Sequence, residues 1–365
     1  MFEKWNSSEK FGFGMGMKRE LLYMLVVGIL LGCSDRREWD EGIDVIKNER
    51  VKSERVVDLS RVGVDEISGF VKRGNRLVVG ATYAKEGFAR CVNLEDREIT
   101  RSVSASGGIR SLSSFNSFDG SSVTALDFRT GELIESPVAP IARGESPESI
   151  TQLPKDKQHL SAVKADDFVI ATGLYEEGRY LLYSLVDGSA RYFLSYPETP
   201  EFPGLRENTK AMLYASSVLR VSPDRSAFVC ADMYSGVIDF CRVAGGAIER
   251  VKTVRLHYPK VKIAEVPSSR VAYTPDNRFG FMDVAVTGDR VYALYSGKTY
   301  RVDRGRAFEC QTLLVYDWEG NLVRSLLLDV ALQGITYDGE EGAVYGITCD
   351  FEMTLVRLGE NNNFK

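Results

Sequence analysis

Histidine is the residue that most often moves protons in enzymes near neutral pH, and this 365-residue chain contains only His159 and His257. A serine or cysteine nucleophile needs such a base within hydrogen-bonding distance, and a third group that orients the base. No Gly-x-Ser-x-Gly sequence, the turn that exposes a nucleophilic serine, accompanies either histidine. We therefore interpret both as surface or hydrogen-bonded histidines and predict that the chain is not an enzyme.

Three pairs of adjacent carboxylates lie where we expect hairpin turns: Asp166-Asp167, Glu176-Glu177 and Glu340-Glu341. Adjacent residues of a strand point to opposite faces, whereas the two carboxylates of a glycosidase must face one substrate bond. Acidic residues at turns have an ordinary explanation in hydrogen bonds to the backbone. Because the chain also has two histidines and no Cys-x-x-Cys, it lacks a zinc motif, and we expect no metal and no cofactor.

The sequence near the N-terminus has the order of a secretory signal. Lys18-Arg19 is a basic n-region, Leu21–Leu31 is an apolar h-region, and Gly32-Cys33 follows directly. An apolar stretch this short does not span a bilayer, which needs about 20 residues, so we interpret it as a cleaved signal. We expect residues 1–16 to be a non-native extension, Met17 the true start, and residues 17–32 the signal peptide.

Residues Leu30-Leu31-Gly32-Cys33 resemble the lipobox of bacterial lipoproteins. The resemblance implies that the Cys33 thiol carries a diacylglyceryl group, with fatty acids such as palmitate, and that Cys33 becomes the mature N-terminus. Ser34 after the cysteine implies the outer membrane, and the mixed charges that follow favour its periplasmic face over the cell surface. The alternative is an ordinary buried cysteine beside a short apolar helix. We interpret residues 33–50 as a charged tether.

Five cysteines remain if Cys33 is acylated, an odd number that cannot be fully paired. Cys230 and Cys241 lie symmetrically about Ser235-Gly236, so they could face each other across a hairpin. In a two-residue hairpin that position is a hydrogen-bonded pair, whose Cα separation suits a disulfide less well. We expect buried free thiols, and the possibility of a disulfide stays open.

A repeated strand pattern must position all of these groups. Between Phe281 and Leu328, short runs rich in Val, Tyr and Leu are broken by glycine-containing turns and by one Arg- and Lys-rich insert, which predicts a four-stranded antiparallel meander. The inner hairpin recurs with turns at Gly74-Asn75, Asp119-Gly120, Asp166-Asp167, Pro223-Asp224-Arg225 and Asp338-Gly339. A spacing of roughly 45 to 65 residues is typical of propeller blades. Six copies predict an all-β, six-bladed propeller over residues 51–360.

Two features concern how the ring closes and where it is extended. Arg55–Leu59 is a lone strand, and the last repeat lacks its outermost strand after Met353–Leu358. A propeller closes by pairing strands from opposite ends of the chain, so we predict that these two segments pair. Long proline-containing inserts at 197–210 and 260–276 flank the fourth repeat, and we expect them to build up one end of the fold.

Several innermost strands are expected to begin with polar residues. In a propeller these strands surround a central channel, and convergent polar groups are what a ligand site uses. The candidate ligand-binding residues are Glu66, Arg110, His159, Arg220, Asp283 and Gln333. A water-filled channel without a ligand would show the same pattern, and the sequence leaves both interpretations open.

The whole body resembles the TolB-like six-bladed propeller lipoproteins of Bacteroidota. The stretches that carry the resemblance are Asp283–Gly297, Val315–Asn321 and Gly334–Asp338. It implies a six-bladed propeller in the bacterial envelope, and it implies little about activity. The net charge of −5 and pI near 5.4 give no basic field, so nucleic acid is not an expected partner.

We therefore predict a monomeric, membrane-anchored lipoprotein whose propeller is a non-enzymatic binding or scaffold module for an envelope protein, a small molecule or a glycan. The alternative is an envelope hydrolase or lyase acting on glycans or peptides, with its active groups in the channel. A sensor that feeds a signalling complex is a third possibility, which the sequence does not separate from the first.

Overall fold

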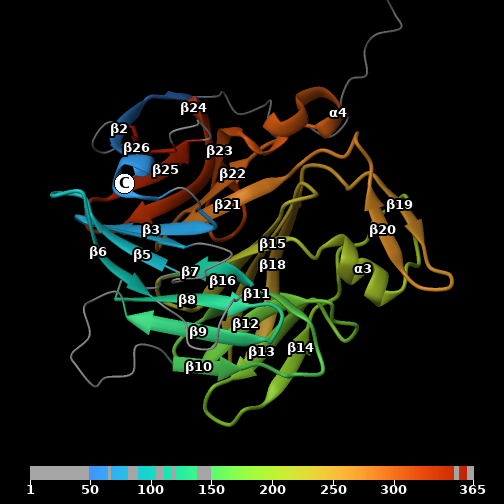
Figure 1. The fold of residues 1–365 in the computed structure, drawn as a ribbon. Coiled ribbons are helices and arrows are strands. Elements are labelled where there is room, and N and C mark those ends of the chain that lie inside the picture. Colours follow the sequence, from blue (N-terminus) through green and yellow to red (C-terminus); the bar gives the residue numbers. More distant parts are fainter. Residues whose placement is uncertain are drawn as a thin grey trace, which may run out of the picture. The chain divides into compact units, whose positions relative to one another are not determined.

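The computed structural model describes residues 49–64, 67–80, 89–103, 111–116, 121–137, 149–348 and 353–359. These residues belong to one compact unit of the chain, residues 42–365. Its regular structure is almost entirely β-strand, and successive sheets follow one another along the chain (Figure 1). The predicted all-β fold built from four-stranded antiparallel blades is confirmed.

Four blades are separate sheets, each of four antiparallel strands. Blade 1 contains β3 (Gly69–Arg73), β4 (Arg76–Gly80), β5 (Ala89–Asn93) and β6 (Glu98–Val103). Blade 2 contains β7 (Leu112–Asn116), β8 (Ser122–Asp127), β9 (Glu132–Pro137) and β10 (Ser149–Gln152). Blade 3 contains β11 (His159–Lys164), β12 (Phe168–Gly173), β13 (Tyr180–Ser184) and β14 (Ala190–Phe193). Blade 4 contains β15 (Ser217–Val221), β16 (Ala227–Asp232), β17 (Val237–Ala244) and β18 (Ala247–Arg255).

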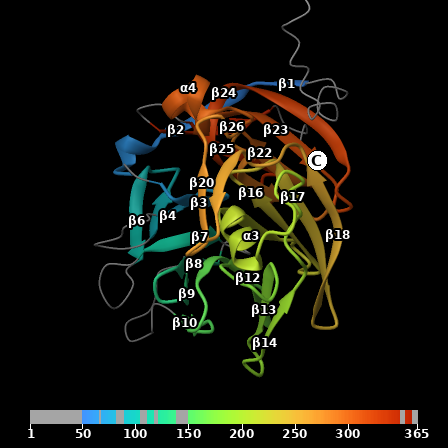
Figure 2. The ribbon, with the colours of Figure 1, turned by 90° about the vertical axis from the view of Figure 1, so that its right-hand side faces the viewer.

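Blades 5 and 6 form one eight-stranded sheet because they share a continuous strand, β24 (Leu322–Asp338). The first part of β24 is the outer strand of blade 5, and its second part is the innermost strand of blade 6. The other strands are β21 (Phe281–Val286), β22 (Val291–Tyr295) and β23 (Cys310–Tyr316) in blade 5, and β25 (Ala343–Thr348), β26 (Thr354–Leu358) and β2 (Ser53–Asp58) in blade 6. Strand β1 (Glu49–Val51) runs parallel to the outer part of β24 (Figure 2).

The ring closes through strand pairing between the two ends of the described chain. Strand β2 pairs antiparallel with β26, with Ser53 opposite Leu358 and Asp58 opposite Thr354. In Figure 1 the blue β2 lies beside the red β26. The predicted pairing of these segments is confirmed. It completes blade 6 with a fourth strand, which removes the exposed edge that β26 would otherwise present.

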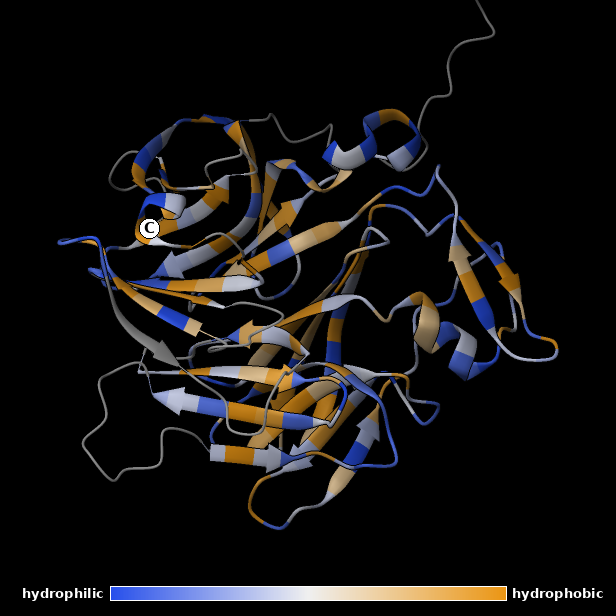
Figure 3. Ribbon diagram, in the orientation of Figure 1, coloured by the Kyte–Doolittle hydropathy of each residue, from blue (hydrophilic) through white to orange (hydrophobic). Residues whose placement is uncertain are grey.

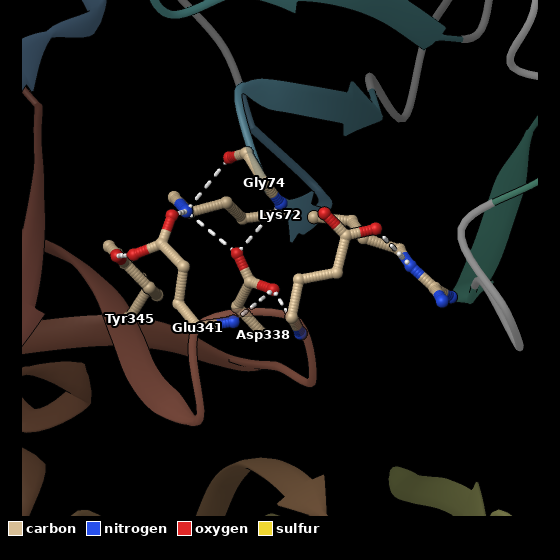
Figure 4. Close-up of polar contacts among 7 residues, drawn as sticks. Lys72, Gly74, Asp338, Glu341 and Tyr345 are labelled. Carbon is tan, nitrogen blue, oxygen red and sulfur yellow. Dashed lines mark hydrogen bonds and ion pairs between the residues drawn. The ribbon is translucent and has the colours of Figure 1, made fainter. Parts of the chain in front are cut away.

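A buried ion-pair network also joins blade 1 to blade 6 (Figure 4). The Lys72 ammonium on β3 lies 2.7 Å from Asp338 Oδ2, 2.6 Å from Glu341 Oε1 and 4.0 Å from the centre of the Tyr345 ring. It also donates a hydrogen bond to the Gly74 carbonyl, and the Gly74 amide donates to Asp338. Lys72 is 3% exposed and Asp338 is fully buried. We call this group the closure cluster.

The core lies between neighbouring blades. One cluster joins Val163 and Ile170 of blade 3 to Leu219 and Phe228 of blade 4, and other clusters join other neighbours in the same way. Middle strands are therefore covered on both faces, and all six residues of β16 are buried. Figure 3 accordingly shows hydrophobic colour concentrated on the strands. Burying one large apolar side chain stabilises the fold by about 1.5–3 kcal/mol.

The inserts beside blade 4, which we expected to build up one end of the fold, contain regular elements that contact each other. Helix α3 (Glu207–Leu213) contacts the hairpin of β19 (Val261–Ala264) and β20 (Arg270–Tyr273). Thr209 Oγ1 on α3 donates to Glu265 Oε1 at 2.7 Å in the loop of that hairpin. A third insert, between β22 and β23, contains the short helix α4 (Tyr300–Asp303) and the 3-10 helix η2 (Arg304–Phe308). Among the described residues, no helix is long and apolar enough to cross a membrane.

The described cysteines are Cys91, Cys230, Cys241 and Cys310, and all four are buried free thiols. Cys230 lies opposite Asp239, and Cys241 lies opposite Phe228. The two thiols are therefore diagonal neighbours, because the hairpin is centred one residue earlier than the Ser235-Gly236 turn assumed from the sequence. Cys33, with the predicted leader and most of the tether, lies outside the described residues.

Candidate binding site in the central channel

The innermost strands of all six blades, β3, β7, β11, β15, β21 and β24, contribute residues to two cavities. The larger cavity, about 740 Å³, lies where these strands end, and the smaller, about 550 Å³, lies where they begin. Phe70, Phe115 and Arg220 line both cavities. The central channel is thus two chambers that meet at these three side chains.

Three of the predicted site residues, Arg220, Asp283 and Gln333, line the smaller chamber. Glu66 and Arg110 lie outside the described residues. His159 lines neither chamber. Its Nδ1 atom is 2.5 Å from the Tyr175 hydroxyl and its Nε2 atom is 2.9 Å from the Pro154 carbonyl. Burial lowers the pKa of His159, so the ring is neutral and held by two structural hydrogen bonds.

β-Bulges explain which side chains reach the smaller chamber. The strand register shifts between His159 and Ser161, between Phe281 and Asp283, and between Leu332 and Gly334. The residues inserted at these bulges are Leu160, Met282 and Gln333, and all three line the smaller chamber. A bulge re-aims side chains locally, so simple alternation along the strand does not predict that His159 faces away.

The centre of the site is an ion pair between blades 4 and 5. Arg220 Nη2 on β15 lies 2.8 Å from Asp283 Oδ1 on β21. The Ile335 amide of blade 6 donates to Asp283 Oδ2 at 2.9 Å, and the Val284 amide donates to Oδ1 at 2.8 Å. Arg220 Nη1 donates to the Leu219 carbonyl at 2.9 Å. Backbone groups therefore hold both side chains in place before any ligand binds.

Burial raises the pKa of Asp283, although Arg220 and the two backbone amides lower it. The pair itself is not sealed from water, because the Arg220 and Asp283 side chains are 22% and 14% exposed. Arg220 uses one Nη1 and one Nη2 hydrogen for the bonds above, and a guanidinium has five N–H donors. It therefore has donors available for an acceptor group inside the chamber.

A second polar bridge joins blades 2 and 3 in the same manner. The Ala162 amide donates to Ser114 Oγ at 2.9 Å, and Ser114 Oγ lies 2.7 Å from Ser161 Oγ. Ala162 follows the bulged Leu160 by two residues, just as Ile335 follows Gln333. In both places, an amide next to a bulge bonds to a side chain of the preceding blade. We did not predict Ser114 or Ser161 as site residues, because nothing in the sequence marks the bulges.

Two aromatic rings that line both chambers, Phe70 and Phe115, lie against glycines. A Cβ atom at Gly80 would lie 2.5 Å from the Phe115 ring, and one at Gly69 would lie 2.8 Å from Phe115 Cβ. A Cβ atom at Gly334 would lie 3.4 Å from the Phe70 ring. Both rings therefore sit against backbone of a neighbouring blade, and they supply an apolar floor to the smaller chamber.

The larger chamber is lined by charged side chains that pair across blade boundaries. Lys164 of blade 3 lies 2.5 Å from Glu135 of blade 2, and Arg73 of blade 1 lies 3.0 Å from Glu340 of blade 6. These cations already have anionic partners, so their charges are less available to a ligand in this chamber. Within the described part of the chain, no cluster of His, Cys, Asp and Glu could hold a metal ion.

Comparison with solved structures finds matches at low sequence identity. The β-propeller domain of Myceliophteria thermophila Cps50 (Swd1) is 11% identical, with 80% of this chain and 96% of that chain covered and a TM-score of 0.44. The RRP9 WD40 repeats are 7% identical, with coverage of 80% and 79% and a TM-score of 0.48. U3-55K is 6% identical, with 80% of each chain covered and a TM-score of 0.48. No curated protein matches the sequence.

A family model described as "TolB-like 6-blade propeller-like" matches residues 128–340. The matched region runs from blade 2 into blade 6 and includes Arg220, Asp283 and Gln333. It covers more than half of the chain, and the number of blades in its description agrees with the blades seen here. The chain therefore belongs to the TolB-like family of six-bladed propellers.

Proposed function

We propose that this protein is an envelope lipoprotein whose propeller binds a ligand, or a segment of a partner, in the smaller chamber of its channel. The observation that carries the proposal is the Arg220–Asp283 pair. Two backbone amides and one backbone carbonyl hold the pair at the wall of a cavity of about 550 Å³. Pockets of this size with a few fixed polar groups and apolar walls are typical of ligand sites.

The chemistry of the chamber favours binding over catalysis. Arg220 can donate hydrogen bonds, Gln333 is exposed at the bulge, and Phe70 and Phe115 provide apolar surface. Neither histidine lines the chamber. The charges of Arg220 and Asp283 cancel, so these two side chains suit an uncharged group with hydrogen-bond acceptors more than a strongly charged one.

A photo-crosslinking amino acid in place of Gln333 tests this site in cells. We expect it to crosslink an envelope component, and we expect the substitutions Arg220→Ala and Asp283→Ala together to abolish that product. The matched control is the pair Arg242→Ala and Glu319→Ala, an exposed ion pair of 3.4 Å on the outside of blades 4 and 5. A crosslink that survives the first double substitution, or is lost equally in the second, contradicts the proposal.

Membrane attachment rests on the leader, where a basic n-region, an apolar h-region and Gly32-Cys33 occur in register. The mass of the N-terminal peptide from the membrane fraction tests it, with and without an inhibitor of lipoprotein signal peptidase. We expect a mature chain that starts at acylated Cys33. An unmodified chain that starts at Met1 would refute the anchor and leave the binding site to be judged by the crosslinking experiment alone.

A further inference from the structure

The connection between β22 and β23 is longer than hairpin closure requires. It runs from Ser296 to Glu309 and contains α4 and η2. The corresponding connection, between the second and third strands of the blade, contains only residues 233–236 in blade 4 and only residues 128–131 in blade 2. We call residues 296–309 the blade 5 insert. Its extra length therefore calls for an explanation other than chain connectivity.

The blade 5 insert exposes three large apolar side chains to solvent. Val302 is 78% exposed, Tyr300 is 49% exposed and Phe308 is 42% exposed. Figure 3 shows hydrophobic and hydrophilic stretches side by side on this insert. Three large apolar residues exposed within nine positions are a feature of surfaces that meet a partner or a membrane.

The same segment is basic, although the whole chain is acidic. Between Lys298 and Glu309 there are four basic residues, Lys298, Arg301, Arg304 and Arg306, and two acidic residues, Asp303 and Glu309, which gives +2 against −5 for the chain. Arg301 is bound to Asp276 outside the insert, with Nη2 2.8 Å from Oδ2. Arg304 is exposed, and Arg306 is 77% exposed, although its Nε lies 3.6 Å from Glu309 Oε2 in a pair that water screens. These two arginines present positive charge to the surroundings.

Internal contacts hold the insert in one shape. Ser296 Oγ donates to the Ala307 carbonyl at 2.6 Å and ties its two ends together. The Phe308 ring lies 4.5 Å from that of Phe279, which precedes β21. The Arg301–Asp276 pair fixes the middle of the insert to the chain before β21. The exposed residues are therefore displayed on a fixed support.

We propose that the blade 5 insert is an interfacial contact that lays Tyr300, Val302 and the flanking arginines against an anionic phospholipid bilayer. Tyrosine and aliphatic side chains partition into the headgroup region while arginines meet lipid phosphates. Charge complementarity favours this occupant, because a protein of net charge −5 approaches an anionic surface only through a basic patch. The contact goes beyond the proposed function, since it does not require that Cys33 be acylated.

Sedimentation with lipid vesicles tests the proposal. The protein used is residues 34–365, which lacks Cys33 and therefore any lipid on it, and which keeps all the described residues. We expect binding to vesicles of phosphatidylglycerol and phosphatidylethanolamine and none to phosphatidylcholine vesicles. One basic side chain near an anionic bilayer contributes about a fivefold gain in affinity, so R304Q/R306Q should weaken binding about 25-fold. The control R61Q/R242Q removes the same charge from side chains that are 73% and 58% exposed elsewhere. No binding to the anionic vesicles, or equal losses in both variants, overturns the proposal.

Fluorescence separates apolar contact from electrostatic attraction alone. V302W should show a blue shift of its added emission when anionic vesicles are present, because the indole leaves water. V266W is the matched control, since Val266 is also 78% exposed but lies in the loop between β19 and β20. A blue shift for V302W but not for V266W supports entry of the blade 5 insert into the bilayer. The absence of a shift for V302W, or the same shift for both variants, refutes it.

Discussion

Two neighbouring cations on β3, Lys72 and Arg73, both reach blade 6 but do so in different surroundings. Lys72 is 3% exposed and its partner Asp338 is fully buried, whereas Arg73 and Glu340 are 41% and 52% exposed. Water screens the exposed pair and leaves it little net energy. In the closure cluster, by contrast, removing one charge leaves its buried partner without a compensating charge, which strongly destabilises the folded protein.

Lys72→Met should lower the free energy of unfolding by about 3–5 kcal/mol, because it leaves the Asp338 carboxylate buried without its cation. Arg73→Met is the matched control and should change it by about 0–1 kcal/mol. Urea unfolding measures both. Similar losses for the two variants would show that the closure cluster has no special role.

Gly80→Ala should destabilise the protein by about 1–3 kcal/mol, since the added methyl group would lie 2.5 Å from the Phe115 ring and must displace that ring from its contact with blade 1. Phe115→Leu removes part of that ring, so the cost of Gly80→Ala should be smaller in the Phe115→Leu background. Gly288→Ala, where a Cβ has no neighbour within 4 Å, is the control. An equal cost of Gly80→Ala in both backgrounds would refute the steric account.

At the scale of single elements, the end of β16 carries a buried carboxyl group with an unusual acidity. Burial raises the pKa of Asp232 to about 7 from an ordinary value of 3.8, although hydrogen bonds from Ser235 and Tyr234 lower it. Between these two values the folded protein holds a proton that the unfolded chain has released. The contribution of Asp232 to stability is therefore fully present at low pH and is lost as the pH rises through about 7.

Asp232→Asn removes this titration and keeps a hydrogen-bond acceptor for the Tyr234 amide. The free energy of unfolding of the wild-type protein should fall more between about pH 5 and pH 8 than that of the variant. All other titrating groups are common to both proteins, so the difference between the two changes isolates Asp232. Identical pH dependence in the two proteins would mean that the carboxyl group is already ionised at pH 5.

At the scale of the whole molecule, closure of the ring depends on a strand that comes from the opposite end of the chain. A chain that starts at Leu59 would lack β1 and β2 and leave the edge of β26 open. We expect it to aggregate or to unfold at a clearly lower temperature than a chain that starts at Glu49. Size-exclusion chromatography and thermal unfolding compare the two. The same melting temperature for both would refute the role of β2 in closure.

Regular features of this ring could be predicted from the sequence, because they depend on local patterns. Gly74-Asn75 between two apolar runs predicts the β3–β4 hairpin, and a lone strand at Arg55–Leu59 predicts the pairing with β26. Features that depend on β-bulges, or on contacts between residues far apart in the sequence, could not be predicted in this way. The bulge that turns His159 away from the channel has no sequence signal, and Lys72 meets Asp338 across 266 positions.

The continuity of β24 and its parallel pairing with β1 also determine how the ring bears mechanical load. A pull along the axis of β1 stretches all of its hydrogen bonds to β24 at once, because the two strands lie side by side from Glu49–Leu326 to Val51–Leu328. The force then passes along one unbroken strand from the rim of blade 5 to the axis of blade 6. A load applied along β1 is thus resisted as shear and shared by two blades.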